Sequence, residues 1–242
     1  MYLMKERPIL FNSHMVRAIL QGQKTVARFE VEGAAAGLLA GHSPEWIAER
    51  ASELCMYGQT GDQLWVQEDT ESQLSPCGAV VLSRYVADKA PVLYSGCEDP
   101  AFNGSVAHWE YPHNVRPGTR MPRWARRIQL EITAVRVERL QSISDGQCIA
   151  EGIIPVPKLN PECEHERQFW RDYHLGGDGT FCVSTPLESF QTLWRHNNGW
   201  SFPKGAKLEP SASNRWDANP WVWVVEFRRI EGAQSTTCLV AA

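Results

Sequence analysis

Arginine and tryptophan residues in the middle of the chain have the side chains needed to bind a phosphate and a base. Positions 113–139 hold seven arginines and two glutamates, a balance of +5 in a chain whose net charge is −4. Arg120, Arg123 and Arg126 are the candidate phosphate ligands, and Trp124 lies among them. Guanidinium groups can pair with phosphates while a base stacks on the indole, which indicates RNA or another single-stranded nucleic acid. The alternative is that Trp124 anchors the core and the arginines pair with surplus acids.

Cysteine and histidine residues near position 170 have donor atoms that zinc binds, but their spacing does not match a zinc motif. These residues are Cys163, His165, His174 and Cys182. Only the Cys-x-His pair is compact, and no CxxC pair occurs among the seven cysteines. We therefore expect reduced thiols and surface histidines, with no metal site and no cofactor.

The hydrophobic spacing predicts short helices and strands without a regular strand–helix alternation. Helices are expected over 13–22, 43–54, 144–152 and 185–199, with N-caps at Ser13, Ser144 and Thr185. Strands are expected over 23–29, 64–66, 79–85, 128–137 and 221–227. The run 221–225 is apolar at every position, which is typical of a strand buried on both faces. The pattern favours an α+β domain around a small β-barrel over a doubly wound sheet.

The composition and the hydrophobic pattern indicate where in the cell the protein is found. Hydrophobic residues make up 43% of the 242 positions, which is enough for a sizeable core. No apolar run approaches the roughly 20 residues of a membrane span, and residues 1–6 lack the apolar part of a signal peptide. We therefore expect a cytoplasmic protein with no membrane partner; the sequence does not identify a protein partner.

Several short motifs follow one another along the chain. They are Gly22-Gln23-Lys24-Thr25-Val26, Gly61-Asp62-Gln63-Leu64-Trp65-Val66, the predicted strand 128–137 and Val224-Val225-Glu226-Phe227, with longer pieces at 8–12, 121–125 and 216–223. In this order they resemble the ASCH-domain family from about residue 8 to 229, and the longer pieces look like the ASCH proteins of phages and prophages. The resemblance implies a PUA-like small β-barrel with flanking short helices. It also implies one domain over 1–230, insertions near 30–55, 70–118, 158–184 and 200–216, and a disordered tail over 231–242.

The resemblance also implies a functional site. ASCH domains are taken to bind RNA or nucleosides, and one branch hydrolyses N4-acetylcytidine to cytidine. That branch has the pattern G-x-K-T-x-T-x-R, whose lysine and second threonine are catalytic, and a glutamate on a later helix. The lysine corresponds to Lys24 and the glutamate to Glu151. Ala27 occupies the nucleophile position, and the final arginine is displaced by one place to Arg28.

These residues leave more than one function open. A lysine with a depressed pKa can act as a base, but Thr25 is the only hydroxyl close to Lys24. We expect a pocket near Lys24 and Glu151 that binds RNA or a modified nucleoside, with Arg28 among its ligand-binding groups. The first alternative is an amidohydrolase acting on N4-acylated cytidines through Lys24, Glu151 and either Thr25 or a water. The second is a phage accessory or interaction protein with a vestigial pocket.

Overall fold

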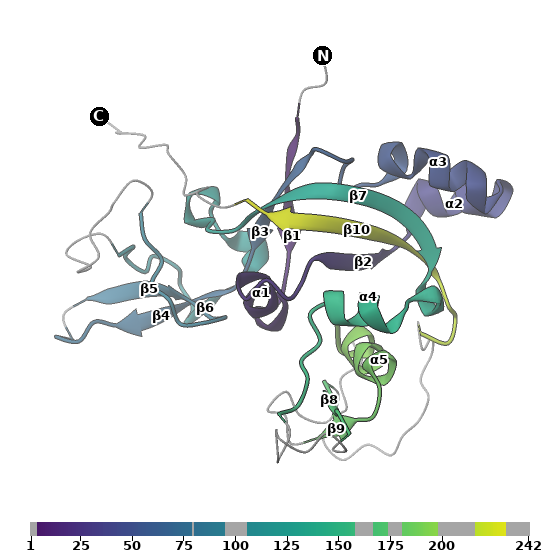
Figure 1. The fold of residues 1–242 in the computed structure, drawn as a ribbon. Helices are drawn as coiled ribbons and strands as arrows, with labels where there is room; N and C mark the ends of the chain where they lie inside the picture. Colours follow the sequence, from purple (N-terminus) through teal and green to yellow (C-terminus); the bar gives the residue numbers. More distant parts are fainter. Residues whose placement is uncertain are drawn as a thin grey trace. The chain divides into compact units, whose positions relative to one another are not determined.

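The computed structural model describes residues 4–78, 80–94, 106–157, 167–173, 181–197 and 216–230. Its helices are α1 Ser13–Leu20, α2 Gly33–Gly41, α3 Pro44–Leu54, α4 Asp145–Ala150 and α5 Pro186–Asn197 (Figure 1). Its strands are β1 Glu6–Leu10, β2 Val26–Glu30, β3 Gln63–Gln67, β4 Thr70–Leu74, β5 Val81–Tyr85, β6 Val115–Arg116, β7 Gln129–Arg139, β8 Trp170–Arg171, β9 Cys182–Val183 and β10 Trp221–Arg229. Short 3-10 helices lie at Gly118–Arg120, Arg123–Ala125 and Leu140–Ser142.

The strands form three sheets. The largest has the order β1-β3-β7-β10-β2, and the smaller ones have the orders β5-β4-β6 and β8-β9. The expected α+β class is therefore confirmed. Within the described ranges the largest sheet has two ends, β1 and β2, so these residues form no closed barrel.

The chain divides into two compact units, each assembled from separated segments. The first comprises residues 1–22, 56–133 and 227–242, and the second comprises 23–55 and 134–226. The expected single domain over 1–230 stays a prediction. The tail 231–242 and most of the insertions expected at 158–184 and 200–216 lie outside the described residues.

The first unit has a parallel strand pair and a small antiparallel sheet. β1 runs parallel to β3, and β3 pairs antiparallel with the start of β7. Tyr85, at the end of β5, is buried in a cluster with Val92, Ala107, Met121 and Ala125. Part of the insertion expected at 70–118 is therefore an ordered sheet with its own small core.

The second unit surrounds β2, β10 and the helices α4 and α5. α4 contacts α5, and β2 pairs antiparallel with β10 so that Arg28 lies opposite Val224. Its core cluster draws on all four elements; among its members are Val26, Phe190, Leu193, Trp194, Val222 and Val224. Residues 222–225 are buried at every position, so the predicted double-sided burial of this strand is confirmed.

Two predicted helix starts are confirmed by their capping bonds. Ser144 Oγ accepts from the Gln147 amide, and the Gln147 side chain accepts from the Ser144 amide, which is a capping box at α4. At α5 the Thr185 hydroxyl accepts from the Glu188 amide, and Glu188 Oε2 accepts from the Thr185 amide. Both boxes are local i to i+3 patterns, and the sequence alone reveals them.

Other local predictions need correction. The N-cap of α1 is Asn12, not Ser13, because Asn12 Oδ1 accepts from the Met15 amide at 2.9 Å. β2 begins at Val26, three residues later than expected, because Lys24 folds back and its ammonium donates to the Val26 carbonyl at 2.8 Å. Helix α2 and strand β4 were not predicted.

Candidate functional site

Lys24 lies just before β2, and its ammonium is enclosed by oxygen atoms. The residue is 2% exposed. Its Nζ donates to Glu151 Oε2 at 2.7 Å, to the Glu151 carbonyl at 3.0 Å and to the Val26 carbonyl at 2.8 Å. Three acceptors match the three hydrogens of an ammonium, so the geometry fits a charged lysine.

Glu151 is placed by the end of α4. It is the C-cap residue of this helix and is 3% exposed. Its Oε2 accepts from Lys24, while its Oε1 accepts from Arg28 Nη1 at 3.0 Å. One carboxylate therefore bridges two cations. In the chain, Glu151 lies 127 positions after Lys24 and 123 positions after Arg28.

Arg28, on β2, connects this carboxylate to two further side chains. Its Nη2 donates to Gln147 Oε1 at 3.0 Å and lies 3.5 Å from Glu138 Oε2. The same Gln147 oxygen accepts from the Ser144 amide, so the group that caps α4 also orients Arg28. The helix start and the site are thus linked through one amide side chain.

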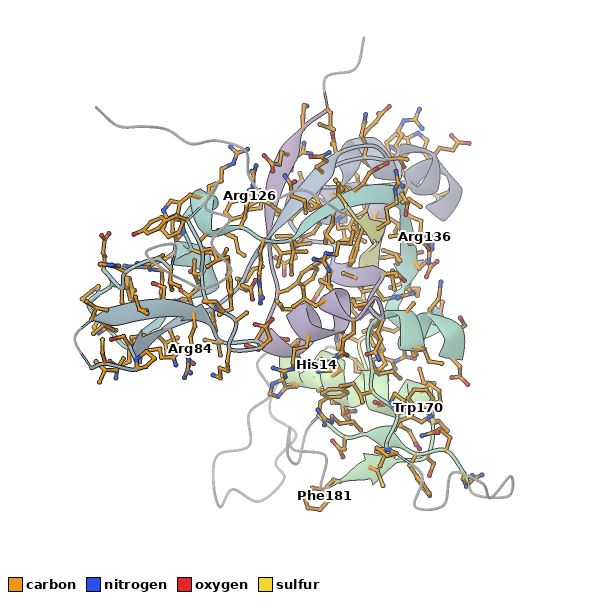
Figure 2. All side chains as sticks on the ribbon, turned by 60° about the vertical axis from the view of Figure 1, so that its left-hand side comes forward. His14, Arg84, Arg126, Arg136, Trp170 and Phe181 are labelled. Carbon is orange, nitrogen blue, oxygen red and sulfur yellow. The ribbon has the colours of Figure 1, made fainter. Side chains whose placement is uncertain are left out.

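The ion pairs continue along β7 and β10. Arg136, labelled in Figure 2, donates to Glu138 Oε1 and to Glu226 Oε1. The connected charged residues are Lys24, Arg28, Arg136, Glu138, Glu151 and Glu226, which we call the β2–α4 network. Three positive and three negative groups balance, as expected where charges are removed from water.

The electrostatics of the network make Lys24 easier to deprotonate. Burial lowers the pKa of the Lys24 ammonium from its ordinary value of 10.5, because desolvation disfavours the charged form. Glu151 opposes this effect and Arg28 adds to it. A buried lysine whose pKa is lowered releases its proton more readily than a surface lysine.

Two polar atoms of the network have no hydrogen-bond partner among the described residues. They are Arg28 Nε, a donor, and Glu138 Oε2, an acceptor, and both atoms are buried. Arg28 is 6% exposed, whereas the side chains of Glu138, Arg136 and Glu226 are 24%, 29% and 42% exposed, so the network reaches solvent at these three residues. Unsatisfied buried polar atoms are uncommon in folded proteins and call for an explanation.

The hydroxyl and nucleophile positions of the resemblance lie apart from this arrangement. Thr25 is exposed, and its amide donates to the Ala150 carbonyl at 2.9 Å. Ala27 is buried in β2. Side chains alternate along a strand, so Ala27 lies on the face opposite Val26 and Arg28, and Arg28 is the residue that contacts Glu151. A hydroxyl at position 27 would therefore point away from the Glu151 carboxylate.

The predicted phosphate ligands lie in the first unit, and two of them already pair with an acid. Arg126, labelled in Figure 2, donates to Glu6 Oε1 at 2.8 Å, and Arg123 donates to Glu6 Oε2. Arg120 is exposed and has no ion-pair partner in the described part of the chain. The alternative interpretation, in which arginines pair with surplus acids, therefore holds for two of the three.

Trp124 is a surface residue rather than a core anchor. It is 40% exposed and stacks on Tyr94, which is 38% exposed, with 5.2 Å between ring centroids. Two stacked rings at the surface leave aromatic area in contact with water. The role of Trp124 in base stacking stays a prediction, and any such surface would include Tyr94.

A second ion cluster, formed around the buried carboxylate of Glu68, was not predicted. Arg127 donates two hydrogen bonds to the carboxylate of Glu68 and two to that of Asp88, and it covers the Tyr85 ring at 3.7 Å. Burial raises the pKa of Glu68, and Arg127 partly offsets this. The four hydrogen bonds of Arg127 link two carboxylates that are 20 positions apart in the chain, so this cluster crosslinks the first unit.

The described residues contain little that bears on the zinc ligands and the membrane. Three of the four candidate zinc ligands, Cys163, His165 and His174, lie outside these residues, and Cys182 is exposed. The described ranges contain no group of three or more His, Cys, Asp or Glu side chains able to hold a metal ion. No helix in these ranges has the length and apolar character needed to cross a membrane.

Gln147 and Glu138 were missed as members of the site. Gln147 precedes Glu151 by four residues, so the two share a face of the turn that ends α4. That spacing was a usable signal, whereas nothing local connects Glu138 to position 28.

Comparisons of the chain with protein-family models, curated proteins and solved structures gave no match.

Proposed function

We propose that this chain binds a modified cytidine, as a free nucleoside or within single-stranded RNA, at the β2–α4 network. We further propose that its fold is the PUA-like barrel of an ASCH domain. One observation carries the proposal: Lys24 Nζ lies 2.7 Å from Glu151 Oε2, and both residues are buried. The resemblance pairs these same two positions, and they are 127 residues apart.

The unpartnered atoms of the network suit the edge of a cytosine. A cytosine presents a hydrogen-bond acceptor at N3 beside a donor at N4. Arg28 Nε supplies a donor and Glu138 Oε2 an acceptor, and neither makes a hydrogen bond among the described residues, although Glu138 Oε2 lies 3.5 Å from Arg28 Nη2. A base that satisfies both atoms would remove the cost of leaving them buried and unpaired. Of the two, the Glu138 side chain is more exposed than that of Arg28, at 24% against 1%, so we place the entry of the base at Glu138.

The aromatic surface of the first unit supports the RNA form of the proposal. The stacked pair Tyr94 and Trp124 offers a platform on which a base of an RNA can stack, and Arg120 offers a charge without an ion-pair partner among the described residues. Because Arg123 and Arg126 share Glu6, we expect few phosphate contacts. The affinity for RNA should therefore depend only weakly on salt concentration.

A second candidate is the hydrolysis of N4-acylated cytidines. The lowered pKa of Lys24 favours it, since it makes loss of the proton easier and only the deprotonated amine can accept a proton from an attacking water, whereas the three acceptors around Nζ favour the charged form. Ala27 and the exposed Thr25 disfavour it, because no threonine hydroxyl faces Glu151. Hydrolysis at this site would then use a water molecule as the nucleophile.

Isothermal titration with N4-acetylcytidine, cytidine and 3-methylcytidine tests the binding proposal. We expect saturable binding of the first two and at least tenfold weaker binding of 3-methylcytidine, whose acceptor is blocked. Glu138→Gln should weaken cytidine binding about tenfold or more, since a hydrogen bond to a charged group contributes roughly 1.5–3 kcal/mol. Glu131→Gln, on the same strand but outside the network, is the matched control. Equal affinities for all three nucleosides, or no saturable binding, would contradict the proposal.

An absorbance assay of N4-acetylcytidine separates binding from hydrolysis. Binding without turnover supports the first candidate. Turnover that disappears in Lys24→Met, while that variant keeps the wild-type circular dichroism spectrum, supports the second. Ala27→Thr should not gain activity, because its hydroxyl would lie on the other face of β2.

A further inference from the structure

The second unit contains a cavity that shares no residue with the β2–α4 network. Its volume is about 360 Å³, at the lower end of the range of small-molecule sites. It is lined by Val31, Ala36, Leu39, Arg139, Pro220 and Trp221. Five of these residues are apolar and one is a cation. This composition, apolar walls with one charged group, is typical of a site for a small organic ion.

The walls of the cavity are held by backbone hydrogen bonds. The Val31 amide donates to the Trp221 carbonyl at 2.9 Å, and the Leu140 amide donates to the Pro220 carbonyl at 2.9 Å. These bonds fix the residue after β2 against the start of β10, and the start of β10 against the end of β7. Helix α2 adds Ala36 and Leu39 from one turn of its length. The cavity is therefore built from regular elements.

The cation of this cavity is held in place. The Arg139 guanidinium lies over the Trp221 ring, 4.3 Å from its centroid, and Nη1 donates to the Asn219 carbonyl at 3.1 Å. Asn219 has φ of +45°, and its side chain accepts from the Gln141 amide at 2.8 Å. An arginine fixed by stacking and one hydrogen bond loses little conformational freedom when it binds an anion.

Arg139 has no carboxylate partner among the described residues, unlike most other arginines near it. Arg127 and Arg136 each contact two carboxylates, whereas the hydrogen bond that Arg139 makes among the described residues goes to a backbone carbonyl. A guanidinium has five N–H donors in a planar fork, which matches a carboxylate through two parallel bonds. The charge of the cavity is therefore complementary to an anion.

We infer that the cavity beside Arg139 and Trp221 binds a small aromatic carboxylate. Its carboxylate accepts two hydrogen bonds from Arg139, and its ring contacts Val31, Ala36 and Leu39. The volume of about 360 Å³ admits a single ring with a short side chain. A phosphate alone would leave the apolar walls unused, so the site prefers an anion with an apolar body.

Titration with phenylacetate and phenylacetamide tests this inference, because the two probes have the same shape and differ in charge. We expect phenylacetate to bind saturably and phenylacetamide to bind at least tenfold more weakly. Arg139→Gln should weaken phenylacetate at least tenfold and remove the difference between the probes. Arg116→Gln, which alters another arginine that stacks on aromatic rings, should leave both affinities unchanged.

A second variant covers the case in which Arg139→Gln does not fold. Ala36→Leu fills the cavity without changing a charge, and it should weaken both probes about equally while the circular dichroism spectrum stays that of the wild type. Equal affinity for phenylacetate and phenylacetamide in the wild type would overturn the inference. So would phenylacetate binding that survives both Arg139→Gln and Ala36→Leu.

Discussion

The buried pair of Lys24 and Glu151 predicts a large coupling energy between the two side chains. The perturbation is a double-mutant cycle with Lys24→Met, Glu151→Gln and the double variant. Replacing Glu151 removes the carboxylate that accepts from both Lys24 and Arg28. The side chains of these two cations are almost completely buried. The remaining acid near these cations is Glu138, which lies 3.5 Å from Arg28.

The magnitude follows from this geometry. Breaking a buried ion pair by removing one partner costs about 3–5 kcal/mol, because the other charge is left uncompensated. The double variant removes both charges, so its loss should be smaller than the sum of the two single losses by roughly 2–3 kcal/mol. A domain is stable by only about 5–15 kcal/mol, so each single variant should lower the urea midpoint strongly.

Urea denaturation followed by circular dichroism at pH 7 measures each free energy of unfolding. The exposed pair of Arg228 and Glu131, at 2.7 Å, is the matched control, and its cycle with Arg228→Met and Glu131→Gln should give about 0.2–1 kcal/mol. If the Lys24–Glu151 coupling is no larger than that of the control, burial of the pair does not govern its energetics. The description of the site as a desolvated ion network would then be refuted.

Three further predictions concern the titration of the site and the backbone that surrounds it. Because burial lowers the pKa of Lys24, the folded state binds fewer protons than the unfolded state between that lowered value and 10.5. The difference in free energy of unfolding between wild type and Lys24→Met, from urea titrations at several pH values, should therefore rise with pH in this window; a falling difference would reverse the assigned shift. Gly58→Ala should lower the melting temperature, because φ is +122° and a Cβ would lie 2.7 Å from Asp62 Oδ2, whereas Gly146→Ala in α4 meets nothing within 4 Å and should be neutral or stabilising by about 0.5–1 kcal/mol. Ser144→Ala should cost about 1 kcal/mol in urea denaturation by removing the capping box, and Ser144→Thr should retain most of it.

The sequence predicted correctly the helix starts and the strand that are determined by residues close together in the chain. The caps at Ser144 and Thr185 depend on residues three apart, and the buried strand at 221–227 depends on a continuous apolar run. Helix α2 was missed because Gly33–Gly41 is apolar throughout, with no polar face to reveal a helical period. Strand β4 was missed because Thr70–Leu74 is mostly polar and only partly buried.

The site could be predicted only in part, because its contacts are not local. The resemblance indicated Lys24 and Glu151, and these two side chains do meet. Spacing could not show that Arg28 would bridge Glu151 and Gln147, or that Arg123 and Arg126 would share Glu6. Such pairings depend on how the fold brings distant segments together. The order of charges along the chain does not predict which of them will pair.

The long separation of Lys24 and Glu151 also constrains when the site can form. The hydrogen bond between them closes a segment of 127 residues, and the entropy of closing a flexible loop of that length costs about 4 kcal/mol. Compaction of the intervening chain must reduce this cost before the pair can form. On the ribosome, residues up to position 150 can emerge and begin to fold while Lys24 still has no counter-ion from α4. The site is thus completed only after α4 has been synthesised, and until then Lys24 favours a solvent-exposed segment over a buried one.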